Sequence, residues 1–313
     1  MQPRYLIVTP CRDEAEFLPR TIASVAAQTI QPKKWIIVDD GSTDSTPEIL
    51  QEAAAQYSFI EVMRCDPSRK RNVGPGVIET FRAGLEQVEL AEYDFLCKLD
   101  ADLEFSPVYF ERLLHEFASD PWLGTISGKT YLKDEHGERE EHIGDENSVG
   151  AAKLYRRECF EEIGGFVPYV GWDAIDGHMC RLSGWKARSI RDIDVRIHHL
   201  RRIGSSQNSF WEGRLRWGRG KYFIGSAWYY VLAASAYRMF EKPYVVSGVG
   251  ILLGYAEAVW RRHRRFEQED VRAALRRFER QSLIYGKART LAGHNRRIER
   301  DFPLRGRNGE ASQ

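Results

Sequence analysis

The feature that most constrains the fold is a regular alternation in the first half of the chain, where short apolar runs are separated by segments of helix length. The apolar runs are YLIVTP (5–10), WIIVDD (35–40), FIEVMR (59–64) and YDFLCKLD (93–100), and amphipathic segments cover 14–27, 45–56, 72–88 and 107–119. This pattern is typical of an α/β fold, with a largely parallel sheet covered by helices on both faces. Ligands of such sheets bind at the carboxyl ends of the strands. The residues directly after each run are therefore the candidates for a site.

Composition excludes some classes of protein. The 313 residues include 46 Lys and Arg against 45 Asp and Glu, and this net charge of +1 makes a nucleic-acid partner unexpected. Five widely spaced cysteines without a C-x-x-C pair argue against a zinc knuckle or a disulfide framework and favour a cytoplasmic location. The N-terminus reads directly as a strand, so we expect no secretion signal.

The C-terminal part has a different character. Apolar segments at 222–240 and 244–260 precede a tail that, from Arg261 onward, carries 15 Lys and Arg against 7 Asp and Glu. A membrane span needs about 20 apolar residues, whereas the second segment has 17 and contains Glu257, and polar and small residues interrupt the first. We therefore expect packed or interfacial helices. The basic run at 261–265 suits an anionic membrane surface, and a soluble helical cap on the α/β domain is the alternative.

Polar motifs follow the first two apolar runs. Thr9-Pro10-Cys11-Arg12-Asp13-Glu14 follows the first, and Asp39-Asp40-Gly41-Ser42 opens the exit of the second. The paired aspartates could accept hydrogen bonds from a base or a ribose hydroxyl, although a helix-capping turn is the alternative. No G-x-G-x-x-G follows the first run, which disfavours a dinucleotide-binding fold.

Two later motifs suit a diphosphate and a cation. Lys70 and Arg71 precede the segment at 72–88, and basic side chains at a helix N-terminus favour phosphate. Asp100 and Asp102 stand at i and i+2 on the exit of the fourth run, so both carboxylates project the same way. Such a pair can hold a divalent cation that bridges a diphosphate. An acidic turn that caps the helix beginning near Ser106 is the alternative.

Together these ordered motifs resemble those of the family 2 glycosyltransferases. The similarity covers roughly residues 4–200 and includes TPCRDEAEFLPRTIASVAAQT, IIVDDGSTDST, KRNVGPG, KLDADLEFSP and the GGF at 164–166 with acidic residues downstream. It implies the GT-A fold, which is Rossmann-like, and inverting transfer of a sugar from a nucleotide sugar. It also implies nucleoside contacts from Thr9, Pro10, Arg12, Glu14, Asp39 and Asp40. Arg71 would approach the diphosphate, and Asp100 and Asp102 would hold Mn²⁺ or Mg²⁺, with Asp102 the more direct ligand.

The catalytic base departs from the family pattern. Members of the family usually carry it in an E-D pair some ten residues beyond GGF, but here the segment reads Gly171-Trp172-Asp173-Ala174-Ile175-Asp176. Counting from Phe166 favours Asp176 as the base, with Asp173 as the second choice. On a helix the two would share one face. The alternative is structural, with Asp173 as an N-cap and Asp176 paired with Arg181.

Residues further on complete the predicted site. His198 or His199 would complete the metal or diphosphate site, with His198 as the prediction and a surface histidine as the alternative. Arg214 and Arg216 lie in a segment similar to the Q-x-x-R-W of processive relatives, although Gly213 occupies the place of the glutamine. We expect both arginines to contact the diphosphate or an acceptor phosphate and infer no processivity. A basic connecting loop is the alternative.

These observations predict a metal-dependent, inverting glycosyltransferase. A UDP-sugar is favoured as donor by family frequency, and the acceptor would be a saccharide, lipid-linked or a polysaccharide precursor, in cell-surface glycan synthesis. We expect a catalytic domain at 1–210, with a nucleotide-binding half to about 105 and an acceptor half from about 106, and a helical region at 211–313. The protein would lie in the cytoplasm or on the inner face of the membrane. The alternatives are an inactive scaffold that binds nucleotide sugar or lipid, and a sugar nucleotidyltransferase, which the absence of a Gly-rich N-terminal loop disfavours.

Overall fold

The computed structural model describes residues 2–66, 75–134, 137–141, 144–201, 210–240 and 244–303. Arg71 lies outside the described residues. The strands are β1 (Tyr5–Cys11), β2 (Lys34–Asp39), β3 (Ile60–Arg64), β4 (Phe95–Leu99), β5 (Leu103–Phe105), β6 (Leu123–Gly128), β7 (Thr130–Asp134), β8 (Gly137–Glu140), β9 (Ala152–Arg156), β10 (Lys186–Ile190) and β11 (Ile197–His199). The helices are α1 (Leu18–Ala26), α2 (Thr46–Gln56), α3 (Pro75–Leu85), α4 (Tyr109–Ser119), α5 (Arg157–Glu162), α6 (Trp172–Leu182), α7 (Phe210–Phe223), α8 (Trp228–Arg238), α9 (Val246–Trp260), α10 (Glu269–Tyr285) and α11 (Lys287–Asp301).

The central sheet is the one that the alternating pattern predicts. Its strand order is β3-β2-β1-β4-β9-β6-β10, and β9 runs antiparallel between strands that are otherwise parallel. The chain builds β2 and β3 on one side of β1 and then returns to place β4 on the other side. Strand order therefore reverses between β1 and β4, and this is the point where open α/β sheets bind their ligands.

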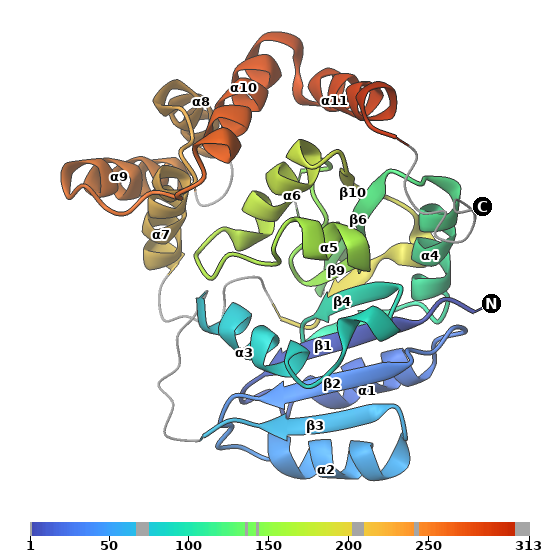
Figure 1. Ribbon diagram of the computed structural model, residues 1–313. Coiled ribbons are helices and arrows are strands. Elements are labelled where there is room, and N and C mark those ends of the chain that lie inside the picture. Colours follow the sequence, from blue (N-terminus) through green and yellow to red (C-terminus); the bar gives the residue numbers. More distant parts are fainter. Residues whose placement is uncertain are drawn as a thin grey trace.

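Two apolar cores cover the two faces of this sheet. One core packs α1, α2 and α4 against one face, and the other packs α3, α5 and α6 against the opposite face (Figure 1). The strands are apolar on both faces because each face is covered; Leu6 and Ile7, which point to opposite sides, are both fully buried. The predicted α/β architecture is confirmed.

A smaller sheet lies beside the switch point, with strand order β5-β11-β7-β8. Its strand β11 pairs antiparallel with β5, so that His199 stands opposite Leu103, and the N–H of Leu200 donates to the carbonyl of Asp102 at 2.9 Å. This pairing brings a segment about a hundred residues later in the chain next to the exit of β4. The second sheet therefore contributes residues to the same edge as β1 and β4.

Two of the C-terminal helices join the core on one face of the central sheet, through Phe223 of α7 and Leu275 of α10. Helices α7, α8 and α9 gather at one end of the molecule, α10 packs against α6, and α11 continues toward β10, where Glu299 pairs with Lys186 (Figure 1). Helices α7 and α9 are in near backbone contact, since a Cβ on Gly218 would lie 2.1 Å from the carbonyl oxygen of Ile251 and one on Gly254 would lie 2.0 Å from that of Leu215. The predicted domain boundary near residue 210 stays a prediction.

None of the described helices is long and apolar enough to cross a membrane.

Candidate active site

The candidate site lies where β1, β2 and β4 end. Cys11 pairs in register with Asp39, and the N–H of Asp40 donates to the carbonyl of Cys11 at 2.8 Å, so the two exits leave the sheet side by side. The exit of β4 adds the D-x-D carboxylates on the other side of β1. We call this cluster the strand-end site: Glu14, Asp39, Asp40, Asp100, Asp102 and His199.

Hydrogen bonds fix the first two loops to one another. The N–H of Asp13 donates to Ser42 Oγ at 2.9 Å, and the N–H of Thr43 returns to Asp13 Oδ1 at 2.8 Å. The N–H of Glu14 donates to Thr46 Oγ1 at 2.8 Å. Asp13 has a left-handed backbone with φ of 54°, a strained conformation that these bonds hold in place. The hydroxyls of the D-D-G-S-T-D-S-T run thus position Glu14, a role that sequence reasoning missed.

The paired aspartates are held in different ways. Asp39 is buried, accepts from the N–H of Ser42 at 2.8 Å and lies 3.3 Å from Arg64 Nε. Asp40 is more open and lies 3.8 Å from Arg12. Asp40 is therefore the more accessible of the two aspartates, and Arg12 lies beside it.

Thr9 does not point toward the strand-end site. Its hydroxyl accepts a hydrogen bond from the indole of Trp35 at 2.8 Å, and the residue is fully buried. The predicted nucleoside contact from this side chain therefore has no geometric basis, because alternation along β1 turns it into the core. Pro10, next along the strand, is partly exposed.

Three side chains could hold a cation. The ligand atoms of Asp100, Asp102 and His199 all lie within 4.8 Å of one another. Two carboxylates and one imidazole form a donor set that suits Mn²⁺ or Mg²⁺ with further oxygen ligands. Among the described residues Glu14 Oε2, in the same cluster, is buried without a hydrogen-bond partner. The residues present therefore fit a divalent cation.

The electrostatics of this cluster also favour an added positive charge. Burial raises the pKa of Asp100, Lys98 opposes that shift and Asp102 adds to it. Burial raises the pKa of Glu14 to about 7, against the charge of Arg201. For His199, burial alone would lower the pKa, but its hydrogen bond to Glu141 and the charges of Glu141, Asp102 and Asp100 raise it. An added cation would relieve the mutual repulsion of these carboxylates.

The structure places His199, and not the predicted His198, beside the carboxylates. The two residues are successive in β11 and their side chains point to opposite sides. His198 is half-buried against Glu138 and the ring of Tyr131. The sequence does not show which face of β11 lies toward Asp100 and Asp102, and the structure places His199 on that face.

The two aspartates of α6 occupy different environments. Asp176 is buried, with Lys153 Nζ 2.5 Å away and the hydroxyl of Tyr155 donating to it. The alternative pairing with Arg181 is wrong, because Arg181 instead donates to the carbonyl of Glu146 and to Asn147. Asp176 is therefore enclosed, and the geometry does not favour it as the group that meets an acceptor.

Asp173 lies in the first turn of α6 and its side chain is exposed. Surrounding protein still desolvates the carboxyl enough to raise its pKa, a shift that Lys153 opposes and Asp176 reinforces. Asp173 forms no N-cap, since Gly171 caps α6 without a side-chain bond. An accessible carboxylate with a raised pKa has the properties of a general base.

Two buried lysines support these acids, and sequence reasoning missed both. Lys98 bonds to Asp100 and donates to the carbonyl of Gly150 at 2.9 Å, while Lys153 bonds to Asp176. Their Nζ atoms lie 5.2 and 5.5 Å from the ring centroid of Trp172. Lys98 and Lys153 differ from surface lysines only in lying between a strand and α6. The sequence does not reveal this position.

Arg201 is a further residue that the sequence analysis missed. It follows β11 and contacts both Asp102 and Glu14. By contrast, Arg214 lies over the ring of Trp217 on α7, and Arg216 is partly buried on the same helix. The phosphate-binding role of Arg214 and Arg216 stays a prediction.

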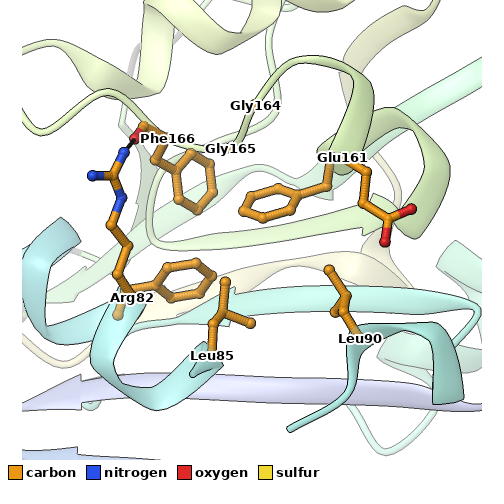
Figure 2. Close-up of a pocket in the computed structure, with 9 residues that line it drawn as sticks. Arg82, Leu85, Leu90, Glu161, Gly164, Gly165 and Phe166 are labelled. Atoms are coloured by element: carbon orange, nitrogen blue, oxygen red, sulfur yellow. Dashed lines mark hydrogen bonds between the residues drawn. The ribbon is translucent and has the colours of Figure 1, made fainter. Parts of the chain in front are cut away.

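A separate apolar pocket of about 230 Å³ lies between α3, α5 and the GGF turn. Figure 2 shows Phe166 and Leu85 on its walls, with Arg82 donating to the carbonyl of Phe166 at 2.6 Å. Its lining includes no residue of the strand-end site.

Comparison with known proteins agrees with this geometry. The sequence model described as Glycosyl transferase family 2 matches residues 6–170. The chain belongs to glycosyltransferase family 2. It is 30% identical over 236 residues to a poly-β-1,6-N-acetyl-D-glucosamine synthase of Staphylococcus aureus, an alignment that covers 67% of this chain and 52% of that protein. The chain thus spans about half the length of this curated relative.

Solved structures extend the likeness beyond the matched segment. The mannosyltransferase PcManGT of Pyrobaculum calidifontis, in complex with GDP-Man and Mn²⁺, has a TM-score of 0.52 at 16% identity, covering 97% of this chain and 89% of that one. Residues 1–349 of S. aureus TarS, in complex with UDP-GlcNAc, have a TM-score of 0.52 at 14% identity, covering 95% and 91%. At these identities the likeness shows the fold alone, and the predicted GT-A fold is confirmed.

Proposed function

We propose that this family 2 glycosyltransferase moves a sugar from a nucleotide sugar to an acceptor hydroxyl with inversion of the anomeric centre. The observation that carries the proposal is the grouping of Asp100, Asp102 and His199 at the switch point of the sheet, beside the exits of β1 and β2. This edge can receive a nucleoside and a metal-bound diphosphate together.

The residues divide the work by position. Asp40 and Arg12 would contact the nucleoside at the rim, with Asp39 held behind them by Ser42. When bound to Asp100, Asp102 and His199, the cation would offset the negative charge that develops on the departing diphosphate. Asp173 would take the proton of the acceptor hydroxyl as it attacks. Displacement in a single step, with base and leaving group on opposite sides of the sugar, inverts the anomeric centre.

Asp176 has a supporting role in this proposal. Its ion pair with Lys153 and its bond from Tyr155 anchor α6 to β9 beneath Asp173, and Lys153 also donates to the carbonyl of Asp173 at 2.8 Å. The pair thereby positions the first turn of α6. Trp172, next to Asp173, lies with its ring beside the two buried lysines.

The relatives support the choice of donor and acceptor classes. A relative is named for a poly-N-acetylglucosamine product, and structural neighbours hold UDP-GlcNAc or GDP-Man. We therefore propose a UDP-sugar as the first donor to test, followed by GDP-sugars. The acceptor would be a saccharide of a cell-surface glycan, either a growing polysaccharide or a lipid-linked precursor.

Exposed apolar side chains on the C-terminal helices support a membrane-bound acceptor. We call Trp228, Leu232, Leu253 and Trp260 the outer apolar residues; Trp228 is 65% and Trp260 is 82% exposed. Spacings of four residues in α8 and seven in α9 place the members of each pair on one side of their helix. The basic run at 261–265 follows directly. These residues would dock the protein on the anionic inner face of the cytoplasmic membrane.

The test is release of nucleoside diphosphate from UDP-, GDP- and dTDP-sugars with Mn²⁺ or Mg²⁺, with and without a saccharide acceptor. We expect turnover of one donor that chelation abolishes and that Asp102→Asn lowers by about 10²–10³-fold, as for loss of a group that stabilises leaving-group charge. Arg112→Gln is the matched control, because Arg112 pairs with Asp192 and Asp194 at an exposed site on α4. If calorimetry detects no binding of any nucleotide sugar with metal, the proposal fails. If one donor binds but no acceptor supports turnover, the protein is a binding scaffold.

A further inference from the structure

Arg201 bridges two parts of the strand-end site that the chain builds far apart. Its Nε lies 2.6 Å from Asp102 Oδ2, at the exit of β4, and a terminal nitrogen lies 2.5 Å from Glu14 Oε1, in the loop after β1. The backbone holds it there, because the N–H of the preceding Leu200 donates to the carbonyl of Asp102. A planar guanidinium thus spans the switch point of the sheet.

The guanidinium of Arg201 places a positive charge beside Asp102, within the cluster that could hold a cation. Asp102 belongs to the cluster that fits a metal, and its Oδ2 is the oxygen that Arg201 contacts. The carboxylates of Asp102 and Glu14 are both buried, so their negative charges repel one another unless a positive charge lies between them. Arg201 supplies that charge, and a divalent ion at Asp102 would repel the guanidinium from the same position.

Arg201 is also better able to move than Lys98, the positively charged side chain that bonds to Asp100. Lys98, which bonds to Asp100, has 2% of its side chain exposed and is fixed by the carbonyl of Gly150. Arg201 has 29% exposed and contacts the protein through its charged end and the ring of Phe17. A guanidinium on a long side chain can leave Asp102 without opening the core.

We propose that Arg201 is a donor-binding residue that occupies the cation position at Asp102 in the empty protein and turns to the diphosphate when metal and nucleotide enter. The inference rests on the proposed use of a metal-bound nucleotide sugar. A diphosphate presents the paired oxygens that a guanidinium fork binds in bidentate fashion. The same side chain would oppose metal binding alone and favour metal and nucleotide together, which couples the two ligands.

Binding measurements separate these two effects without any need for turnover. Calorimetry would compare the wild-type protein and Arg201→Gln with MnCl₂ alone, and then with UDP, GDP and dTDP in saturating Mn²⁺. We expect Arg201→Gln to bind Mn²⁺ alone about 10-fold more tightly and the nucleoside diphosphate with Mn²⁺ about 10-fold more weakly, within the usual range of coupling between sites. A loss of structure alone would weaken both.

Two variants complete the design. Arg112→Gln removes a comparable ion-paired arginine at an exposed position on α4 and should change neither affinity. Arg201→Lys keeps the charge without the fork, so it should leave the Mn²⁺ affinity near wild type and still weaken nucleotide binding. It also serves as the test variant if Arg201→Gln lowers the melting temperature.

The outcomes distinguish this inference from the proposed function. If the wild-type protein binds Mn²⁺ with UDP, GDP or dTDP and Arg201→Gln leaves both affinities unchanged, or weakens both, the inference is overturned and the proposed function stands. If the wild-type protein binds none of UDP, GDP and dTDP with Mn²⁺, both are overturned.

Discussion

The strand-end site and the outer apolar residues differ in burial, because the site buries charged side chains and the outer residues expose apolar ones. At the site, charged groups such as Glu14, Asp39 and Asp102 are buried and paired, each held by a partner from another part of the chain. On α8 and α9, Trp228 and Trp260 are largely exposed. Buried charge requires partners or a ligand, whereas exposed apolar area indicates a second surface. The site is built for a small charged ligand and the helices for an apolar partner, so variants in one region should leave the function of the other unchanged.

The largest effect is expected at Asp173. Asp173→Asn should lower kcat by about 10²–10⁴-fold, the usual contribution of a general base, with little change in melting temperature because the side chain is exposed. Its carboxylate acts only when ionised, and desolvation by the surrounding protein raises its pKa. Activity should therefore fall with decreasing pH at a higher pH than an ordinary aspartate would give. Steady-state rates across pH, with the exposed Glu161→Gln as control, measure both effects.

If Asp173→Asn kept its activity while Asp176→Asn lost it without unfolding, the order predicted from the sequence would be right and the geometric argument wrong.

The next effect concerns the stability contributed by the buried ion pair of Lys153 and Asp176, which supports the first turn of α6. Lys153→Met leaves Asp176 buried without its ion-pair partner and should lower the free energy of unfolding by about 3–5 kcal/mol. The double variant Lys153→Met with Asp176→Leu removes both charges and should recover much of the loss. Urea unfolding of the two single variants and the double variant forms a double-mutant cycle. Additive losses would show that the two groups do not interact.

The smallest effect is expected at the outer apolar residues. Leu253→Ser combined with Trp260→Ser should weaken binding to anionic liposomes by about 10-fold, because side chains that are only partly buried at the interface contribute less than the about 1.5–3 kcal/mol each of full burial. Release of nucleoside diphosphate from the free donor should not change. Sedimentation with vesicles at low and high salt is the measurement, and salt should weaken the basic contribution. Equal vesicle binding by the wild type and the variant would contradict a role of these side chains in membrane binding.

Much of the site could be read from residue order. The apolar runs predicted the strands, and the polar residues after them predicted Glu14, Asp39, Asp40, Asp100 and Asp102, because carboxyl ends of parallel strands meet at one edge. Thr9 was misplaced because it lies inside β1, where alternation decides the direction of a side chain. His198 was chosen over His199 for the same reason.

The sequence alone determined the family, the α/β class and the set of carboxylates, since these depend on short-range patterns of hydrophobicity and on motifs within a few residues. Only the tertiary structure decided which histidine lies beside the carboxylates and which aspartate of α6 is exposed. His199 rather than His198, and Asp173 as the exposed partner of the buried Asp176, depend on the pairing of β11 with β5 and on Lys153 from β9. Arg201 could not be found at all, because its partners Glu14 and Asp102 come from distant parts of the chain and meet only at the switch point.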